Sequence, residues 1–158
     1  MKGIVKNVIT TLFGAVIGAI GMQKINEKAI VKNAEMSDKH LSLFLLMNQW
    51  VKIKQEGKNL SSYFEENGYH EIAIYGISYA GETLVNELAG STVKIKYAID
   101  RNADNIYVEI NVLSPEDELE DVDAIVVTAI KFFDEIEEML SEKVSCPIIS
   151  LEDILYEI

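Results

Sequence analysis

The chain has 158 residues and a net charge of −12, a length that allows one domain with a sizeable core but not a full two-half dinucleotide fold. Its single cysteine argues against a disulfide framework and favours a reducing compartment. Residues 1–60 carry nine lysines against four acidic residues, whereas residues 61–158 carry 22 acidic residues against five basic ones, which argues against nucleic acid as a partner.

The amino-terminal segment is uncharged and apolar. Residues 7–23 contain no charged side chain, and with Ile4 and Val5 the apolar span reaches about 19 residues, or about 28 Å as a helix. Lys6 and Lys24 flank the span and can extend toward water. We therefore expect a transmembrane anchor. A cleaved signal peptide and a hydrophobic or interfacial helix are the alternatives.

Two patterns around this anchor bear on orientation and partners. Lys24, Lys28 and Lys32 recur every four residues, so a continuing helix would hold them on one face beside the anionic cytoplasmic leaflet. The following domain is therefore expected on the cytoplasmic side of the membrane. Gly14 and Gly18 form a GxxxG pattern, which allows close helix pairing and suggests a homo-oligomer.

Two helices are expected to precede the first strand. The first has an N-cap at Ser37 or Asp38 and ends near Gly57. Its apolar stripe is expected to cover a sheet and comprises Leu41, Phe44, Leu45, Met47 or Asn48, Val51 and Ile53, with Trp50. A shorter helix starts at Asn59 and stops at residues 67–68. Residues 1–36 thus form the anchor and a juxtamembrane neck, and residues 37–158 form a domain whose covering helices lie within residues 37–68.

The run IAIYGISYAGETLVNEL, residues 72–88, changes from an extended pattern to a helical one across a glycine-rich turn. Residues 72–75 predict a strand buried on both faces of a parallel sheet, and apolar residues at helical spacing predict a helix that begins near Tyr79. Gly76, Ser78 and Gly81 lie between or just inside these elements. Such a turn leaves backbone N–H groups at a helix N-terminus free to hold an anion. Alternatively, the two glycines only permit a tight turn and close packing.

Asp100 is the second indication of a ligand site. Residues 93–99 alternate as a second strand, and Asp100 follows it, 24 residues after Gly76, where a Rossmann unit places the acid that binds ribose hydroxyls. A solvated acid in the turn DRNADN is the alternative. Ser78 occupies the position of the middle glycine in the dinucleotide motif, which disfavours NAD, although its hydroxyl can donate to a phosphate oxygen.

No catalytic constellation accompanies the turn. The segment GISYA approximates the nucleophile elbow of hydrolases, but both histidines, His40 and His70, precede Ser78 in the chain. No tyrosine is followed by a lysine four residues later, as short-chain dehydrogenases and epimerases require. The acidic runs at residues 116–123 and 134–138 are expected to be solvated helix faces without a metal ion. The chain therefore favours a binding function over an enzymatic one.

The remaining pattern is of the α/β type. Residues 106–112 predict a short edge strand, and Ser114 and Pro115 predict a helix start. A buried strand is expected at residues 123–128, followed by a helix at residues 132–140. A strand at residues 146–149 and a last helix that starts at Ser150 complete the pattern. About five strands, short connections and no repeats predict a three-layer, Rossmann-like parallel sheet preceded by N-terminal helices. A ligand should lie above the strand ends that carry Gly76, Asp100 and, more weakly, Thr128.

From about Lys39 to Ile158, the segments IAIYGISYAGETL, YAIDRN, SPEDELEDVDAIVVTA and CPIISLEDIL resemble the small Rossmann-like domains found with bacterial cell-surface polysaccharide enzymes. These include the nucleotide-sugar-binding domain of bacterial sugar acetyltransferases and modules attached to glycosyltransferases. The resemblance implies that Gly76, Ser78, Gly81 and Asp100 face a nucleotide or nucleotide sugar. It also implies a role in polysaccharide biosynthesis, with an assembly enzyme as a partner.

The sequence therefore predicts a membrane-tethered, cytoplasmic module that binds a nucleotide or nucleotide sugar. Two alternatives remain open. One is a non-catalytic adaptor with a degenerate Rossmann domain, and the other is an NAD-linked sensor or oxidoreductase.

Overall fold

The computed structural model describes the backbone of residues 2–158 and the side chains of residues 28–158. Its first element is helix α1 (Lys2–Gln55), and the chain divides within this helix into two compact units, residues 1–41 and 42–158. The expected helix start at Ser37 or Asp38 is wrong, because both residues lie inside α1. No glycine or proline occurs between residues 22 and 56 to end the helix earlier.

The expected transmembrane segment, residues 7–23, lies outside the residues whose side chains are described. Within residues 28–158, no helix has both the length and the apolar composition needed to cross a bilayer. Gly14 and Gly18, on which the expected helix pairing rests, also lie outside the described side chains.

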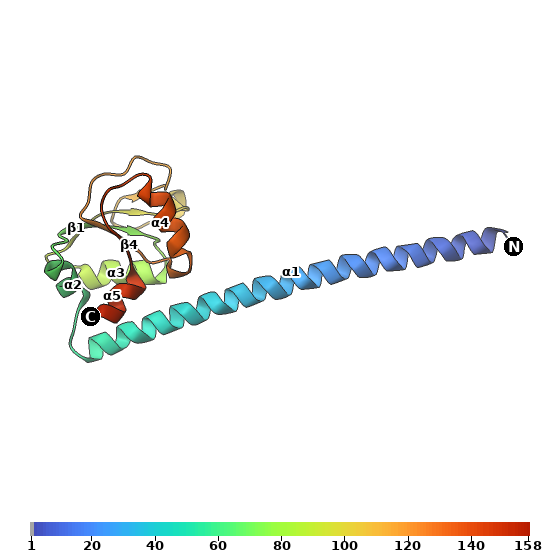
Figure 1. Ribbon diagram of the computed structural model, residues 1–158, viewed down its shortest axis with the longest axis horizontal. Helices are drawn as coiled ribbons and strands as arrows, with labels where there is room; N and C mark the ends of the chain where they lie inside the picture. Colours follow the sequence, from blue (N-terminus) through green and yellow to red (C-terminus); the bar gives the residue numbers. More distant parts are fainter. Residues whose placement is uncertain (1) are drawn as a thin grey trace. The chain divides into compact units, whose positions relative to one another are not determined.

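The second unit is an α/β fold with a five-stranded parallel sheet (Figure 1). The strand order is β3-β2-β1-β4-β5, with β1 (Glu71–Tyr75) central, flanked by β2 (Lys94–Ile99) and β4 (Ala124–Val127). Two short strands, β3 (Val112–Leu113) and β5 (Ile148–Ser150), form the edges of the sheet. The prediction of about five strands in a parallel sheet is confirmed, and the strand order agrees with a Rossmann-like arrangement.

Alternate residues of the central strands belong to two separate hydrophobic cores, one on each face of the sheet. Ile72 and Ile74 pack with the carboxyl-terminal part of α1, with α2 (Leu60–Glu66), α3 (Tyr79–Leu88) and α5 (Leu151–Glu157). Ala73 and Tyr75 pack on the other face with α4 (Phe133–Ser141). Figure 1 shows α4 on one side of the sheet and α3 and α5 on the other. This burial on both faces explains the continuous apolar strands that the sequence contains.

Two predicted helix starts are confirmed by capping contacts. The Asn59 side chain accepts a hydrogen bond from Ser62 N at the start of α2, and the Ser150 side chain accepts one from Glu152 N at the start of α5. Trp50 lies in the core at 3% exposure, as expected. Ile53 of the predicted stripe is also buried, and Met47 is partly buried. The rest of the stripe is wrong: Leu41, Phe44, Leu45 and Val51 are exposed, and Leu46, which the prediction omitted, is buried.

Two further predictions are wrong. The edge strand covers residues 112–113 only, because a largely exposed loop, residues 106–111, occupies most of the predicted range. No helix begins at Ser114, where the backbone instead closes a turn: Asp117 N donates to Ser114 O, and Ser114 N donates to the Asp117 carboxylate. A compact Asp-containing turn replaces the helix N-terminus that Ser-Pro suggested.

Candidate functional site

The predicted glycine turn joins β1 to α3 at the point where the strand order reverses, between β1 and β4. Gly76 follows the last residue of β1 and has a φ of +99°, a conformation that strongly favours glycine. A Cβ at this position would lie 2.8 Å from Thr128 Oγ1. The Gly76 N–H donates to Ile99 O of β2 at 2.8 Å, so the turn leaves the sheet while still joined to its neighbour.

Gly81 lies in the first turn of α3, directly against the preceding glycine. A Cβ on Gly81 would lie 2.1 Å from the carbonyl oxygen of Gly76, a backbone atom that cannot move without displacing β1. Both glycines therefore have a steric role in the chain's own packing. These distances support the alternative that the two glycines only permit a tight turn and close packing.

Asp100 lies at the end of β2 and faces the turn. One carboxylate oxygen accepts a hydrogen bond from Ile77 N at 2.9 Å, and the other accepts one from Asn102 N at 2.9 Å. The structure therefore brings Asp100 to the glycine turn, as the sequence predicted, but it also gives this carboxylate a structural role. Each carboxylate oxygen keeps a second lone pair that can accept a hydroxyl donor.

Ser78 is the N-cap residue of α3 and is exposed. Its side chain makes no capping hydrogen bond, and its carbonyl accepts from Glu82 N at 2.8 Å. Within the described residues, the N–H groups of residues 78–81 donate to no protein acceptor. Unpaired amides and the positive end of the helix dipole can attract an anion.

Thr128 follows β4 and is buried, at 5% exposure. Its hydroxyl lies 2.6 Å from Gly76 O and 3.2 Å from Tyr75 O, and its N–H donates to Tyr75 O at 2.9 Å. Thr128 thus joins β4 to the turn. It holds the Gly76 carbonyl, against which Gly81 packs.

The sequence analysis missed a positively charged residue at the carboxyl end of β2, on the face of the sheet that α4 covers. Arg101 is the only arginine of the chain and follows Asp100. The buried Tyr75 hydroxyl has no well-formed hydrogen bond among the described residues, but its proximity raises the pKa of the Arg101 guanidinium. Arg101 Nη2 also lies 3.7 Å from the Glu135 carboxylate of α4. The one available signal was the position of this sole arginine at a predicted strand end.

Two cavities among the described residues lie away from this turn. One, of about 310 Å³, is near the amino ends of β4 and β5 and is lined by Leu119–Val122 and by residues 142–146, including the half-buried Cys146. The other, of about 290 Å³, lies between α2 and the chain end.

The structure also bears on the hydrolase alternative. His70 lies immediately before β1 and Ser78 lies after it, so a five-residue strand of about 16 Å separates the two ends. Among residues 28–158, no cluster of three or more histidine, cysteine, aspartate or glutamate side chains is arranged to hold a metal ion.

No protein family, curated protein or solved structure matches this chain.

Proposed function

We propose that the chain is a nucleotide or nucleotide-sugar-binding module that holds the ligand's diphosphate at the N-terminus of α3. The observation that carries this proposal is the set of unpaired N–H groups at residues 78–81, which lie at the strand-order reversal and next to Asp100. Ser78 and Tyr79 are exposed, whereas Ala80 and Gly81 are buried. Four adjacent amide donors and a helix dipole match the charge of a diphosphate.

Neighbouring side chains define the rest of the ligand. Asp100 keeps lone pairs that can accept from ribose hydroxyls while it holds Ile77 N. Arg101 supplies a positive charge at the adjacent strand end, which balances a second phosphate or an acidic sugar. Ser78 places a side chain where dinucleotide-binding turns have glycine, which favours a nucleotide sugar over NAD.

The proposed biological role is polysaccharide assembly at the cytoplasmic face of a membrane. This part of the proposal draws on the resemblance of residues 39–158 to domains of polysaccharide enzymes and on the uncharged run at residues 7–23. Alkaline washing of membranes should leave the full chain in the pellet, whereas a chain without residues 1–30 should be released. Full-length protein found entirely in the soluble fraction would contradict the tether.

Calorimetric titration of the full chain in mild detergent, with UDP-sugars, GDP-sugars and NAD, tests the binding proposal. We expect one class of nucleotide sugar to bind with a dissociation constant below about 1 mM, equivalent to about −4 kcal/mol. Preferential binding of NAD would support the sensor or oxidoreductase alternative. Absence of binding by all three classes at millimolar concentration would contradict the proposal.

The non-catalytic adaptor is the second candidate, and a specific observation favours it. Gly76, Gly81, Asp100 and Thr128 all have roles in packing or hydrogen bonding within the turn, so their presence does not require a ligand. The same titration separates the two candidates, because an adaptor with a normal thermal melt would bind no nucleotide sugar.

A further inference from the structure

The carboxyl-terminal part of α1 uses one of its faces to join the domain. Leu46, Trp50 and Ile53 are buried in the core that covers the sheet. The Gln49 side-chain amide donates to Leu155 O at 3.0 Å, which joins α1 to α5. Spacings of three and four residues place these side chains on one side of the helix.

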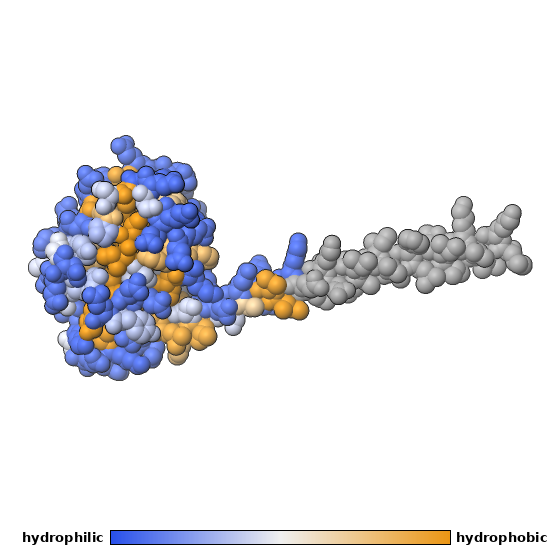
Figure 2. Space-filling model, in the orientation of Figure 1, coloured by the Kyte–Doolittle hydropathy of each residue, from blue (hydrophilic) through white to orange (hydrophobic). Residues whose placement is uncertain are grey.

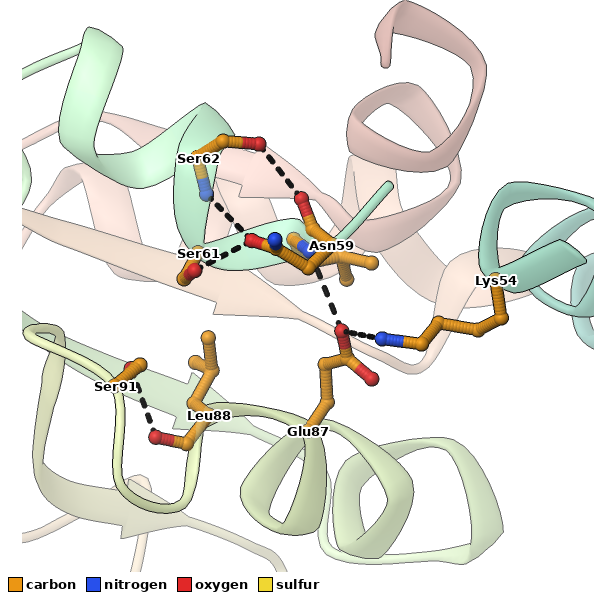
Figure 3. A network of polar contacts seen from close by, with 8 residues as sticks. Lys54, Asn59, Ser61, Ser62, Glu87, Leu88 and Ser91 are labelled. Carbon is orange, nitrogen blue, oxygen red and sulfur yellow. Dashed lines mark hydrogen bonds and ion pairs between the residues drawn. The ribbon is translucent and has the colours of Figure 1, made fainter. Parts of the chain in front are cut away.

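A polar network fixes the end of α1 on the same side (Figure 3). Lys54 Nζ lies 2.7 Å from Glu87 Oε1 of α3, and the same oxygen lies 3.4 Å from Leu60 N at the start of α2. Figure 3 shows Glu87 between Lys54 and the segment that Asn59 caps. The rotation of α1 about its axis is therefore set by contacts with α2, α3 and α5.

This rotation leaves an apolar face of α1 in solvent. In the second unit, Phe44 is 66% exposed, Leu45 is 47% exposed and Val51 is 52% exposed, and Asn48 lies between them. Figure 2 shows hydrophobic surface in orange along the described part of α1. Large apolar residues on one helix face indicate an interaction surface more strongly than isolated ones do.

The spacing on this face is that of a coiled-coil seam. Phe44, Asn48 and Val51 are separated by four and three residues, which is the a/d alternation of a heptad. Counted back along the sequence, the same alternation meets four more uncharged residues: Leu41, Ser37, Ala34 and Ile30. Every charged residue between positions 30 and 51 lies outside the a and d positions. The residues that face the domain, Leu46, Trp50 and Ile53, lie at positions c and f.

From this arrangement we infer that a second copy of this chain pairs with residues 30–51, parallel and in register, through the seam that contains Phe44, Asn48 and Val51. This pairing requires neither a ligand nor the glycines Gly14 and Gly18.

Asn48 specifies the occupant and its direction. In a parallel, in-register pair the two Asn48 amides meet and can donate to each other, and a single asparagine at an a position favours two strands and one register. In an antiparallel pair each a position faces a d position of the other helix, so the two Asn48 amides would not meet. A seam without charge is also self-complementary, as a two-fold interface requires.

Sedimentation equilibrium of the full chain in density-matched detergent tests the pairing. We expect the wild-type chain to have twice the chain mass. The double variant Phe44→Lys/Val51→Lys should dissociate at least about ten-fold more readily, because it places charges in the seam. Tyr156→Lys, which changes an equally exposed aromatic residue on α5, is the matched control and should remain dimeric. A monomeric wild-type chain, or a double variant with unchanged association, would overturn the inference.

Disulfide formation tests the register. In a Cys146→Ser background, Asn48→Cys should form a covalent dimer under mild oxidation, because facing a positions in a parallel pair lie within disulfide reach. Glu137→Cys, exposed on α4 across the sheet, is the control. Cross-linking of Asn48→Cys no greater than that of this control would overturn the parallel, in-register arrangement.

Discussion

The carboxylate of Asp100 accepts a hydrogen bond from Ile77 N at 2.9 Å, which ties the end of β2 to the turn after β1. The same side chain accepts from Asn102 N at 2.9 Å. Asp100→Ala removes the acceptor for two backbone N–H groups, so we expect the free energy of unfolding to fall by about 1–3 kcal/mol. Urea unfolding of the full chain measures this change.

A nearby acid is the control for this prediction. Asp104 is exposed and lies in the short helix that follows Asp100, and Asp104→Ala should change stability by no more than about 0.5 kcal/mol. Equal effects of the two variants would mean that the contact with the turn contributes nothing measurable.

The contact between Gly81 and Gly76 predicts the sign of a second stability change. Alanine is a better helix former than glycine by about 1 kcal/mol, so Gly81→Ala would stabilise an unobstructed helix. Here its Cβ would lie 2.1 Å from Gly76 O, and we expect a loss of about 1–3 kcal/mol. Asn86→Ala, at an exposed site on α3, is the control. A higher unfolding midpoint for Gly81→Ala would contradict the close contact.

The partly buried carboxylate of Glu87 predicts a third change. Its side chain is 11% exposed and contacts both Lys54 Nζ and Leu60 N. Glu87→Ala should lower the free energy of unfolding by about 1–2 kcal/mol, since half of the partner Lys54 remains in water. The exposed pair Lys58–Glu56 is the comparison, and Glu56→Ala should cost less than about 0.5 kcal/mol in the same thermal melts. A smaller loss for Glu87→Ala than for Glu56→Ala would refute the role of this network.

Burial of Tyr97 predicts an alkaline limit to stability. Burial raises the pKa of its hydroxyl from 10.0 to about 12, and the hydroxyl donates to Glu120 O at 2.7 Å. Between these pH values the unfolded chain loses this proton before the folded chain does, so stability is complete below pH 10 and falls as the pH rises toward 12.

Unfolding free energies measured between pH 9 and pH 12 check this prediction. Tyr97→Phe should make the decline shallower, with a residual slope from Tyr63, whose pKa burial also raises. Tyr107→Phe, at a residue that is 92% exposed, should leave the decline unchanged. Identical slopes for Tyr97→Phe and the wild-type chain would exclude Tyr97 as the source.

The sheet was predictable because its central strands are buried on both faces. Residues 72–75 and 124–127 are apolar without interruption, which is typical of strands in a parallel sheet between two helical layers. The edge was not predictable in the same way. Residues 106–111 alternate like a strand, but they have no partner strand beyond β2 and remain a loop with Tyr107 exposed.

The face of α1 that packs on the domain could not be read from periodicity. Apolar residues occur on opposite sides of the helix, at Leu46 and Trp50 and also at Phe44 and Val51, so two stripes fit the same segment. Tertiary contacts from Lys54 and Gln49 select the stripe that is buried. The helix continues through Ser37 because no glycine or proline interrupts residues 22–56.

The candidate site was only partly predictable. Strand-end spacing placed Gly76, Gly81 and Asp100 together because parallel strands end at one edge of a sheet. Spacing does not give hydrogen-bond partners, so the bond from Ile77 N to Asp100 and that between Thr128 and Gly76 were not foreseen. Arg101 was missed because its proximity to Tyr75 depends on which face of the sheet each side chain takes.

Gly81 is unsuitable for testing ligand binding because substitution there disturbs the fold, whereas Ser78 is exposed and caps α3 without a side-chain bond. Aspartate and asparagine are equally good N-cap residues, so Ser78→Asp and Ser78→Asn should fold equally well and differ only in charge. Calorimetric titration of both variants with the nucleotide sugar that binds the wild-type chain is the most direct measurement. We expect Ser78→Asn to bind within about three-fold of wild type and Ser78→Asp to bind at least about ten-fold more weakly, because its carboxylate repels the diphosphate. Equal affinities of the two variants would contradict a diphosphate at the N-terminus of α3.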